Sequence, residues 1–253
     1  MRPRSILITG ASSGIGRALA LEYARAGARV ALCARRTEEL EAVAAGVRAA
    51  GGQALPMTVD VTDTSAVSDT VRRADHELGG LEMVVANAGR GDWRHASQLR
   101  WQDVEAVLDV NAKGAMATLI AAVPVFLAHQ GGHLVAVTSL AGRRGLPMSA
   151  AYCASKSATT VFLESLRIDL AAAGIRVTDV QPGFVSTSMT ENVEHPTPFR
   201  WTADKAARHI ARRLERGPAV IAFPWTLAFA ASLARLVPAA IYDRIARVAA
   251  TSA

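Results

Sequence analysis

The chain has 253 residues, of which 51% are hydrophobic, and this size suits one α/β domain over 1–253. The net charge of +6 is spread over short arginine pairs, so we do not expect nucleic-acid binding. Cys33 and Cys153 are too few for a disulfide framework, and no secretory leader precedes the first apolar run, so we expect a cytoplasmic protein. The histidines show no ligand spacing, so we expect no metal.

Short apolar runs alternate with longer helix-periodic stretches in the first part of the chain. In order, we expect a strand in SILITG, a helix over 15–26, a strand in ARVALCA, a helix over 38–50, a strand in ALPMTVD, a helix over 65–78 and a strand in LEMVVANAG. This βαβαβαβ order is typical of a parallel sheet.

The second half continues the alternation. We expect a long helix over 101–129, a strand in HLVAVTS, a helix that contains AAYCASKSA, a strand in IRVTDVQPG, a helix over 202–216 and a strand in AVIAFP. The fold class is therefore α/β: a Rossmann-like doubly wound parallel sheet of about seven strands, with helices on both faces. Ligands of such sheets bind beyond the carboxyl ends of the strands, so the candidate residues are sought there.

The stretch TGASSGIG, residues 9–16, follows the first strand and opens the first helix. Glycines in this position let backbone amides approach a pyrophosphate at the helix N-terminus. An ordinary tight turn is the alternative, but the place between strand and helix favours a dinucleotide site. The residues expected to form it are Gly10, Ser12, Ser13, Gly14, Ile15 and Gly16.

The second strand ends in LCARR, with Ala34 where an acidic residue would bind the ribose hydroxyls of NAD. Arg35 and Arg36 follow, and a guanidinium pairs well with the 2′-phosphate of NADP. Solvated charges at a helix start are the alternative; we predict NADP(H) rather than NAD(H). Asp60 and Val61, after the third strand, suit an adenine site and an ordinary turn equally well.

Tyr152 and Lys156 lie four residues apart in an expected helix, so both side chains can face one ligand. A nearby ammonium lowers the pKa of a phenol from its usual value of about 10, which suits Tyr152 for general acid–base chemistry. Ser139 ends the preceding strand and can hydrogen-bond the same substrate oxygen. Singly, each residue has a structural explanation, but their place on the side of the glycine turn favours a reactive site.

From residue 5 to about residue 224, the chain resembles a short-chain dehydrogenase/reductase of the non-extended type. TGASSGIG matches the TGxxxGxG motif of that family, YCASK matches YxxxK and PGFVST matches PGxxxT. ANAG matches NNAG, with Ala86 in place of the first asparagine. The resemblance implies a nicotinamide-dependent oxidoreductase.

The resemblance also implies roles for individual residues. Asn111 would hold a water in a proton relay, and Lys156 would also bind the nicotinamide ribose. The complete relay would be Asn111, Ser139, Tyr152 and Lys156. Further cofactor contacts implied by the resemblance or by position at strand ends are Asn87, Ala88, Gly89, Pro182, Gly183, Val185 and Thr187.

We therefore predict an NADP(H)-dependent enzyme that interconverts a hydrophobic ketone or aldehyde with its alcohol, with Tyr152 as acid or base. One alternative is an isomerase resembling sugar-nucleotide epimerases and dehydratases, although their glycine turn has two residues, not three, between the first two glycines. The other is a non-catalytic dinucleotide sensor, which has little need of the whole reactive set. The resemblance implies a homodimer or homotetramer.

Apolar residues just beyond the reactive strand ends form the expected substrate wall. Arg143 and Arg144 in the same segment could bind an acidic substrate, but we interpret them as a solvated pair. The wall residues are Trp93, Ala141, Leu146, Met148, Phe184 and Met189. Residues 184–216 would supply a substrate loop and helix.

An apolar C-terminal extension occupies 225–253. Pro224 interrupts the apolar run of 218–234, so we do not expect a transmembrane helix. The extension could lie on a membrane surface or cover an apolar pocket. Its basic residues are few and Asp243 interrupts them, so we favour burial in protein over contact with lipid.

Overall fold

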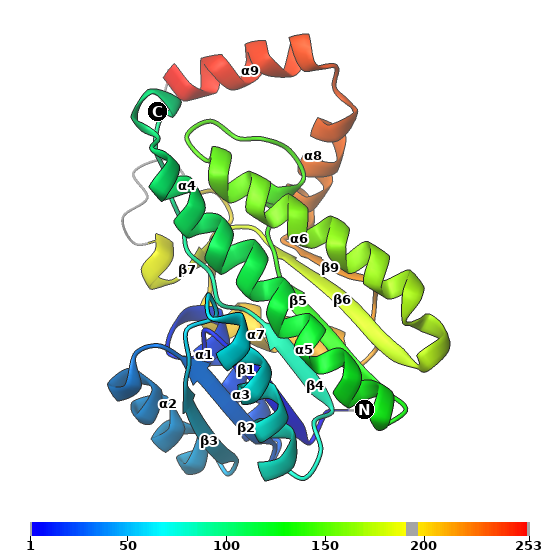
Figure 1. Cartoon of the computed structure of the whole chain (residues 1–253). Coiled ribbons are helices and arrows are strands. Elements are labelled where there is room, and N and C mark those ends of the chain that lie inside the picture. Colours follow the sequence, from blue (N-terminus) through cyan, green and yellow to red (C-terminus); the bar gives the residue numbers. More distant parts are fainter. Residues whose placement is uncertain (1, 191–196, 252–253) are drawn as a thin grey trace.

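The computed structural model describes residues 2–190 and 197–251, and seven of their strands form one parallel sheet (Figure 1). The strand order β3-β2-β1-β4-β5-β6-β9 confirms the predicted doubly wound architecture. The strands are β1 Ser5–Thr9, β2 Arg29–Ala34, β3 Gln53–Thr58, β4 Met83–Ala86, β5 Gly132–Val137, β6 Ile175–Pro182 and β9 Val220–Phe223. A separate parallel pair consists of β7 Val185–Ser186 and β8 Trp201–Thr202.

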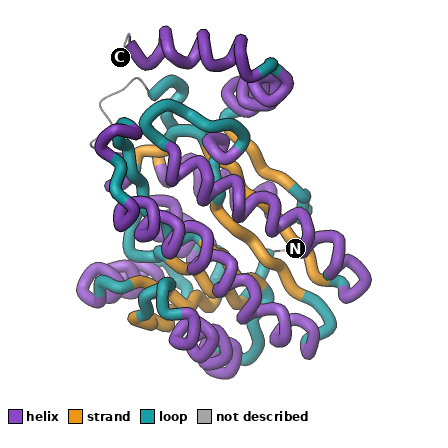
Figure 2. Tube along the Cα trace, turned by 45° about the horizontal axis from the view of Figure 1, so that its top comes forward, coloured by secondary structure: helices purple, strands orange, loops and turns teal. Residues whose placement is uncertain are grey.

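Helices cover both faces of the sheet because each strand carries apolar side chains on both sides (Figure 2). In β1, Ile6 and Ile8 belong to one buried cluster and Leu7 to the other. One layer contains α1 Gly14–Ala24, α2 Thr37–Ala49 and α7 Ala203–Leu214. The other contains α3 Thr64–Glu77, α4 Trp101–Leu108, α5 Ala115–Ala128 and α6 Ala150–Asp169.

The predicted helix over 101–129 contains a π-helical segment, Asp109–Gly114, between α4 and α5. A Cβ on Gly114 would lie 2.8 Å from the Cγ2 atom of Val61, so glycine allows the helix to pass close to the loop after β3. Trp101–Ala128 is long and apolar enough to cross a membrane, but 44% of its most apolar window is buried inside the molecule. Core helices pass the same test of length and composition.

Beyond β9 the chain forms α8 Trp225–Leu236 and α9 Ala239–Thr251, which extend past the sheet (Figure 1). The strand and helix on either side of Pro224 agree with the expected break. Several large apolar side chains of the extension are exposed: Trp225, Phe229, Leu233, Leu236, Ile241 and Ile245. They are not buried in the core of this chain.

The interpretation of Arg143 and Arg144 as a solvated pair is wrong. The Nη1 atom of Arg143 donates to the carbonyl oxygen of Ala228 at 2.8 Å, inside α8. The Arg144 guanidinium lies 4.3 Å from the ring centroid of Tyr242, whose hydroxyl donates to the Gly145 carbonyl at 2.6 Å. Both arginines hold the extension against the loop before α6, because helix carbonyls and an aromatic face replace their water.

Candidate functional site

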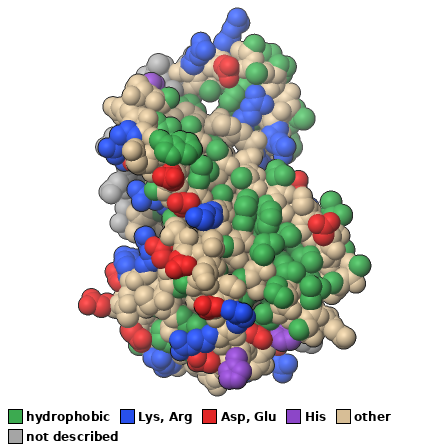
Figure 3. Space-filling model, in the orientation of Figure 1, with side chains coloured by type: hydrophobic (Ala, Val, Ile, Leu, Met, Phe, Trp, Pro, Cys, Tyr) green, Lys and Arg blue, Asp and Glu red, His purple; other side chains and the backbone are tan. Residues whose placement is uncertain are grey.

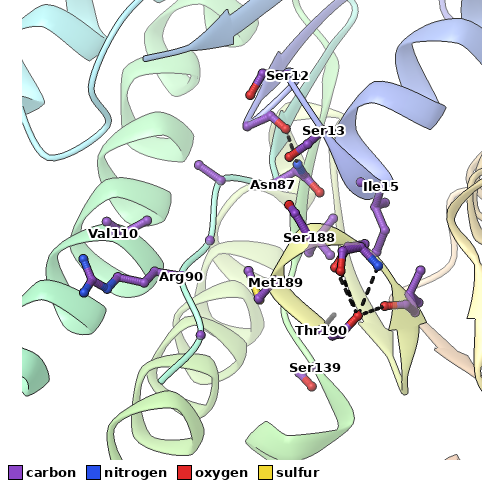
Figure 4. A pocket seen from close by; sticks show the side chains of 18 of the residues that line it. Ser12, Ser13, Ile15, Asn87, Arg90, Val110, Ser139, Ser188, Met189 and Thr190 are labelled. Carbon is purple, nitrogen blue, oxygen red and sulfur yellow. Dashed lines mark hydrogen bonds between the residues drawn. The ribbon is translucent and has the colours of Figure 1, made fainter. Parts of the chain in front are cut away.

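A cavity of about 560 Å³ lies at the carboxyl ends of the strands (Figure 4). In Figure 4, Ser13 of the glycine turn and Ser139 mark its two ends, with Met189 between them. Nearly all predicted cofactor and catalytic residues line it: Gly10, Ser12, Ser13, Gly14, Ile15, Arg35, Arg36, Asp60, Val61, Asn87, Ala88, Gly89, Ser139, Tyr152, Lys156, Pro182, Gly183, Val185 and Thr187. Gly16 and Asn111 do not belong to the lining.

The turn between β1 and α1 has room for backbone only. Gly10 and Gly14 have φ angles of 65° and 55°, which residues with a Cβ rarely adopt. A Cβ on Gly10 would lie 2.7 Å from the Cα of Ala88, and one on Gly16 would lie 2.4 Å from the carbonyl oxygen of Gly10. Gly16 therefore acts by letting α1 approach the strand end. The turn provides the backbone cradle that a pyrophosphate requires.

Asn87 connects this turn to the end of β4. Its Nδ2 atom donates to the carbonyl oxygens of Thr9 at 2.9 Å and Gly10 at 3.2 Å. Its backbone amide and that of Ala88 both donate to the Thr9 hydroxyl, at 3.0 and 3.2 Å. The predicted strand over LEMVVANAG therefore stops at Ala86, because the following amides bond across to β1. Asn87 lines the cavity and also holds the turn in shape.

The end of β2 carries two arginines beside the glycine turn. Arg36 donates from Nη2 to the Ser12 hydroxyl at 3.3 Å, and its Nη1 atom lies 3.1 Å from Glu39 Oε1. Arg35 lies 3.6 Å from Asp60, measured from Nη1 to Oδ2. Burial disfavours the charge of Asp60, but hydrogen bonds from Thr62 and the charge of Arg35 outweigh it and lower its pKa. This end of the cavity therefore carries two guanidinium groups, each of them paired with a carboxylate.

The reactive residues lie at the opposite end. Ser139 lies two residues after the end of β5, and Tyr152 and Lys156 come from the first two turns of α6. The Lys156 ammonium donates to the carbonyl oxygen of Val137 at 2.9 Å and lies 5.8 Å from the Tyr152 ring centroid. Tyr152 is half-buried and hydrogen-bonded to Ser139. The structure thus brings the predicted serine, tyrosine and lysine together.

The expected lowering of the Tyr152 pKa is not found in the protein itself. Burial raises the pKa of Tyr152, and the hydrogen bond with Ser139 opposes this only partly. Burial also lowers the pKa of Lys156 to about 8, while the charge of Asp179 acts in the opposite direction. In the protein alone the ammonium does not outweigh the burial of Tyr152, because it is directed at the Val137 carbonyl and is itself desolvated. Tyr152 is consequently a protonated acid at neutral pH.

Asn111 lies behind the cavity wall, within the π-helical segment. Its Oδ1 atom accepts from the Arg90 amide at 2.7 Å, and its Nδ2 atom donates to the Arg90 carbonyl at 2.9 Å and to the Ser155 hydroxyl at 3.1 Å. A Cβ built on Gly89 would lie 3.5 Å from Asn111 Oδ1 and 3.7 Å from Lys156 Nζ. Both Nδ2 protons of the asparagine are therefore used in structural hydrogen bonds, and its Oδ1 atom accepts one of the two that it can accept.

Only part of the expected substrate wall lines the cavity. Trp93 does, with its ring centroid 6.1 Å from that of Tyr152, and so does Met189. The remaining four wall residues do not belong to the lining: Ala141, Leu146, Met148 and Phe184. Leu146 and Met148 are exposed on the loop before α6 because Pro147 and the left-handed backbone of Met148 (φ 58°) turn that loop outward. Phe184 contributes its carbonyl to the Trp201 amide at 2.9 Å.

Sequence reasoning missed several residues of the lining. Thr190 is the clearest case: its hydroxyl donates to the Val185 carbonyl at 2.7 Å and accepts from the Thr187 amide at 3.1 Å. It therefore shapes the turn after β7. The second threonine in TSMT was the available signal, since threonine often forms such local turns. Arg90 and Val110 also line the cavity, and no sequence pattern singles them out.

Metal ligands do not gather in the described residues. No group of three or more His, Cys, Asp or Glu side chains in residues 2–190 and 197–251 is placed to hold a metal ion. His195 and the remainder of 191–196, part of the predicted substrate loop, lie outside the described residues.

Comparison with known proteins agrees with this geometry. A sequence profile of the short chain dehydrogenase family matches residues 4–197. The chain is 44% identical over 247 residues to an uncharacterized oxidoreductase of Myxococcus xanthus, with 98% of each chain covered. It is 41% identical over 183 residues to glycine betaine reductase ATRR of Emericella nidulans, covering 72% of this chain and 14% of that protein.

Two solved structures show the same architecture. A short-chain type dehydrogenase/reductase from Mycobacterium marinum has a TM-score of 0.80 and 28% identity, with 87% of this chain and 93% of that chain covered. An alcohol dehydrogenase from the archaeon Thermococcus sibiricus, complexed with 5-hydroxy-NADP, has a TM-score of 0.79 and 26% identity, with 87% and 94% covered. From the profile match, the long shared alignment and the common fold, we conclude that the chain belongs to the short chain dehydrogenase family of oxidoreductases.

Proposed function

We propose that the protein is an NADP(H)-dependent oxidoreductase that interconverts an apolar ketone or aldehyde with its alcohol. The observation that carries this proposal is the position of Ser139, Tyr152 and Lys156 at one end of a cavity whose other end has Arg35 and Arg36. The glycine turn lies between these groups in the order that a dinucleotide would require.

The preference for NADP rests on the two arginines at the nucleotide end of the cavity, whose guanidinium groups can donate to a 2′-phosphate. Arg35 and Arg36 lie where β2 ends, and Ala34 replaces the acidic residue that would repel a 2′-phosphate. Ser12 shares a hydrogen bond with Arg36 and adds a hydroxyl to the same wall. The Thermococcus sibiricus relative, whose structure contains 5-hydroxy-NADP, supports the same choice.

In the proposed reduction, Tyr152 donates its phenolic proton to the carbonyl oxygen while Ser139 hydrogen-bonds that oxygen. Bound NADPH supplies the hydride. The raised pKa of Tyr152 keeps the acid protonated at neutral pH. The Lys156 ammonium, 5.8 Å from the Tyr152 ring centroid, is proposed to favour the phenolate that forms. We assign Asn111 to the relay through the structure that it imposes on Arg90, which follows Gly89, and on Ser155, which precedes Lys156 in α6.

Trp93 and Met189 suggest an apolar substrate. The Trp93 ring lies beside Tyr152 with an angle of 31° between the ring planes, and Met189 lies against Gly89 and Gly91. Both side chains present carbon and sulfur surface next to the proposed acid, so a bulky apolar carbonyl compound would bury more surface there than a small polar one.

We also propose that the enzyme is a cytoplasmic homodimer or homotetramer that self-associates through the outer face of α4, α5 and α6. Figure 3 shows hydrophobic side chains gathered over α5 and α6. The exposed members of this face are Trp101, Ile120, Leu127, Val161 and Ile168. Light scattering coupled to size-exclusion chromatography should give a dimer or larger, and Ile168→Arg should give a monomer.

The apolar side chains of α8 and α9 are proposed to be covered by protein rather than lipid. Arg235, Arg244 and Arg247 are the arginines of the described extension, and Asp243 reduces their net charge. Co-sedimentation with vesicles of anionic phospholipid should leave the protein in the supernatant. Salt-sensitive capture by those vesicles would reverse this assignment.

The function is tested by titrating NADPH and NADH into the protein and then screening apolar aldehydes and ketones for NADPH consumption. Tighter binding of NADPH and turnover with at least one carbonyl compound are expected. Absence of NADPH consumption across a broad panel would overturn the proposal. Tightly retained NAD without net turnover would favour an epimerase or dehydratase, and cofactor binding with no function lost in Tyr152→Phe would favour a sensor.

A further inference from the structure

A carboxylate is buried on β6, the strand next to the edge strand β9, behind the reactive residues. Asp179 of β6 is 2% exposed and accepts a hydrogen bond from the Thr138 hydroxyl. It also accepts from the Thr160 hydroxyl at 2.9 Å and from Gln181 Nε2 at 2.7 Å. A carboxylate this deep costs folding free energy unless its neighbours compensate its charge.

The neighbouring groups fix Asp179 as a hydrogen-bond acceptor. Arg143 Nε donates to Gln181 Oε1 at 2.7 Å, and a guanidinium can only donate. The other end of the Gln181 amide, its NH₂ group, must therefore point at Asp179. Arg143 is itself held by α8, through the Ala228 carbonyl at 2.8 Å and the Ser232 hydroxyl at 2.5 Å. A continuous hydrogen-bond chain thus connects the C-terminal extension to Asp179.

The same carboxylate lies between the two elements that hold Lys156. In the sheet, Asp179 pairs with Ala136, next to Val137, whose carbonyl accepts from the Lys156 ammonium at 2.9 Å. Thr138 follows Val137, and Thr160 follows Lys156 by one turn of α6; both donate to Asp179. Lys156 is 5% exposed, so its ammonium has lost most of its water. An opposite charge nearby is what such an ammonium needs.

We propose that Asp179 is the buried counter-ion and positioning residue of Lys156, and that Gln181 and Arg143 orient it for this role. The inference rests on the proposed function, in which Lys156 assists Tyr152. The charged and titratable groups around this pair are Tyr152 of α6, Arg143 of the loop after β5, and Arg235 of α8, which acts on Arg143. The adjoining π-helical segment contributes neutral Asn111.

The chain has three lysines, Lys113, Lys156 and Lys205, so each can be followed separately by NMR after selective lysine labelling. In Asp179→Asn, the midpoint of the Lys156 titration should fall by about one pH unit or more, since an opposite charge within reach shifts a pKa by that order. Lys113 and Lys205 should titrate as in the wild type. In parallel, kcat for NADPH-dependent reduction at neutral pH should fall by about tenfold, with the KM for substrate little changed.

Thr178→Val is the matched control. Thr178 is a neighbour of Asp179 in β6 and is fully buried, but it bonds His133 at 2.8 Å and the Pro218 carbonyl at 2.6 Å instead. The control should destabilise β6 without moving the Lys156 titration. If Thr178→Val shifted the midpoint of the Lys156 titration as much as Asp179→Asn does, the proposal would be overturned, because any disturbance of β6 would then have the same effect.

Milder variants test the proposal if Asp179→Asn does not fold. Thr160→Val and Gln181→Leu each remove one hydrogen-bond donor to Asp179 and keep the carboxylate in place. Each should shift the midpoint of the Lys156 titration by a measurable amount. The proposal is overturned if Lys156 titrates at its wild-type midpoint in every folded variant. Because this readout needs no turnover, an inactive wild type would contradict the proposed function alone, whereas an active wild type with an unmoved lysine would contradict this inference alone.

Discussion

The two ends of the cavity are built in different ways. At the nucleotide end, the predicted residues lie within a few positions of a strand end, and the glycine turn is shaped by backbone: Gly10 has no space for a Cβ, and Asn87 bonds to carbonyl oxygens. At the substrate end, the walls come from long connections, and only Trp93 and Met189 of the six expected residues belong to them. Short strand-to-helix turns are determined locally, whereas the long loops depend on what packs over them.

This difference has consequences for mutation. Changes at the nucleotide end should act on binding of the cofactor, through backbone geometry at the glycine turn and through side-chain charge at the arginines. Changes at the reactive end should act on the chemical step. Changes in the extension should act on the stability of α8, α9 and the loop before α6. The experiments below are ordered from the largest expected effect to the smallest.

Tyr152→Phe should lower kcat/KM for carbonyl reduction by about 10³-fold, because it removes the proton donor. Binding of NADPH, measured by fluorescence titration, should change little. Tyr23→Phe is the matched control, since Tyr23 is buried and its hydroxyl only approaches Met83 Sδ at 3.9 Å. Loss of cofactor binding together with activity would mean that the two ends of the cavity are not separable.

Gly10→Ala should weaken NADPH binding by about 100-fold and lower the free energy of unfolding by about 1–3 kcal/mol, because its φ of 65° is strained and its Cβ meets Ala88. Gly27→Ala separates the two causes, since Gly27 has a φ of 76° and nothing within 4 Å of its Cβ. That control should lose stability alone, by about 1 kcal/mol. Binding titrations and denaturant titrations measure the two effects. Similar losses of NADPH affinity in the two variants would contradict the assignment of the glycine turn to pyrophosphate binding.

Arg35→Asp should raise the Kd for NADPH by about 10-fold or more, because a charged hydrogen bond to the phosphate is lost and a carboxylate is placed beside Asp60. The Kd for NADH should change less. Arg208→Asp makes the same charge change on an exposed position of α7 and should leave both constants near their wild-type values. Equal weakening of both cofactors in Arg35→Asp would remove the reason for assigning NADP.

The pH dependence should reflect Lys156, whose pKa burial lowers to about 8. Below that pH the ammonium is present, so the rate of reduction should be nearly constant through neutrality and should fall as pH rises past about 8. Because the folded pKa lies below the unfolded one, the contribution of Lys156 to stability should instead increase from about pH 8 to about pH 10.5. Initial rates and denaturation curves on the same samples test these opposite directions.

Tyr242→Phe should have the smallest effect. It removes the 2.6 Å hydrogen bond to Gly145 and should lower the free energy of unfolding by about 1 kcal/mol or less. Hydrogen exchange should accelerate in α9 and in the loop before α6, while the Kd for NADPH should stay unchanged. An effect on the cofactor would contradict the separation between the extension and the nucleotide end.

Most of the fold and of the nucleotide end could be predicted because they depend on local patterns. Apolar strands on both faces of a sheet, TGASSGIG after a strand and YCASK on a helix each specify their neighbourhood within a few residues. Arg143 was misinterpreted for the opposite reason. Its partners lie in α8, Ala228 and Ser232, more than eighty positions along the chain, and no local pattern in GRRG points to them.

The sequence by itself determined the parallel α/β architecture, the glycine turn and the tyrosine–lysine spacing, because period and steric fit are properties of neighbouring residues. Only the tertiary structure decided the protonation of Tyr152, the environment of Lys156 and the anchoring of the extension. These depend on desolvation and on charges contributed by distant strands and helices, such as Asp179 in β6, whose positions no short stretch of sequence contains.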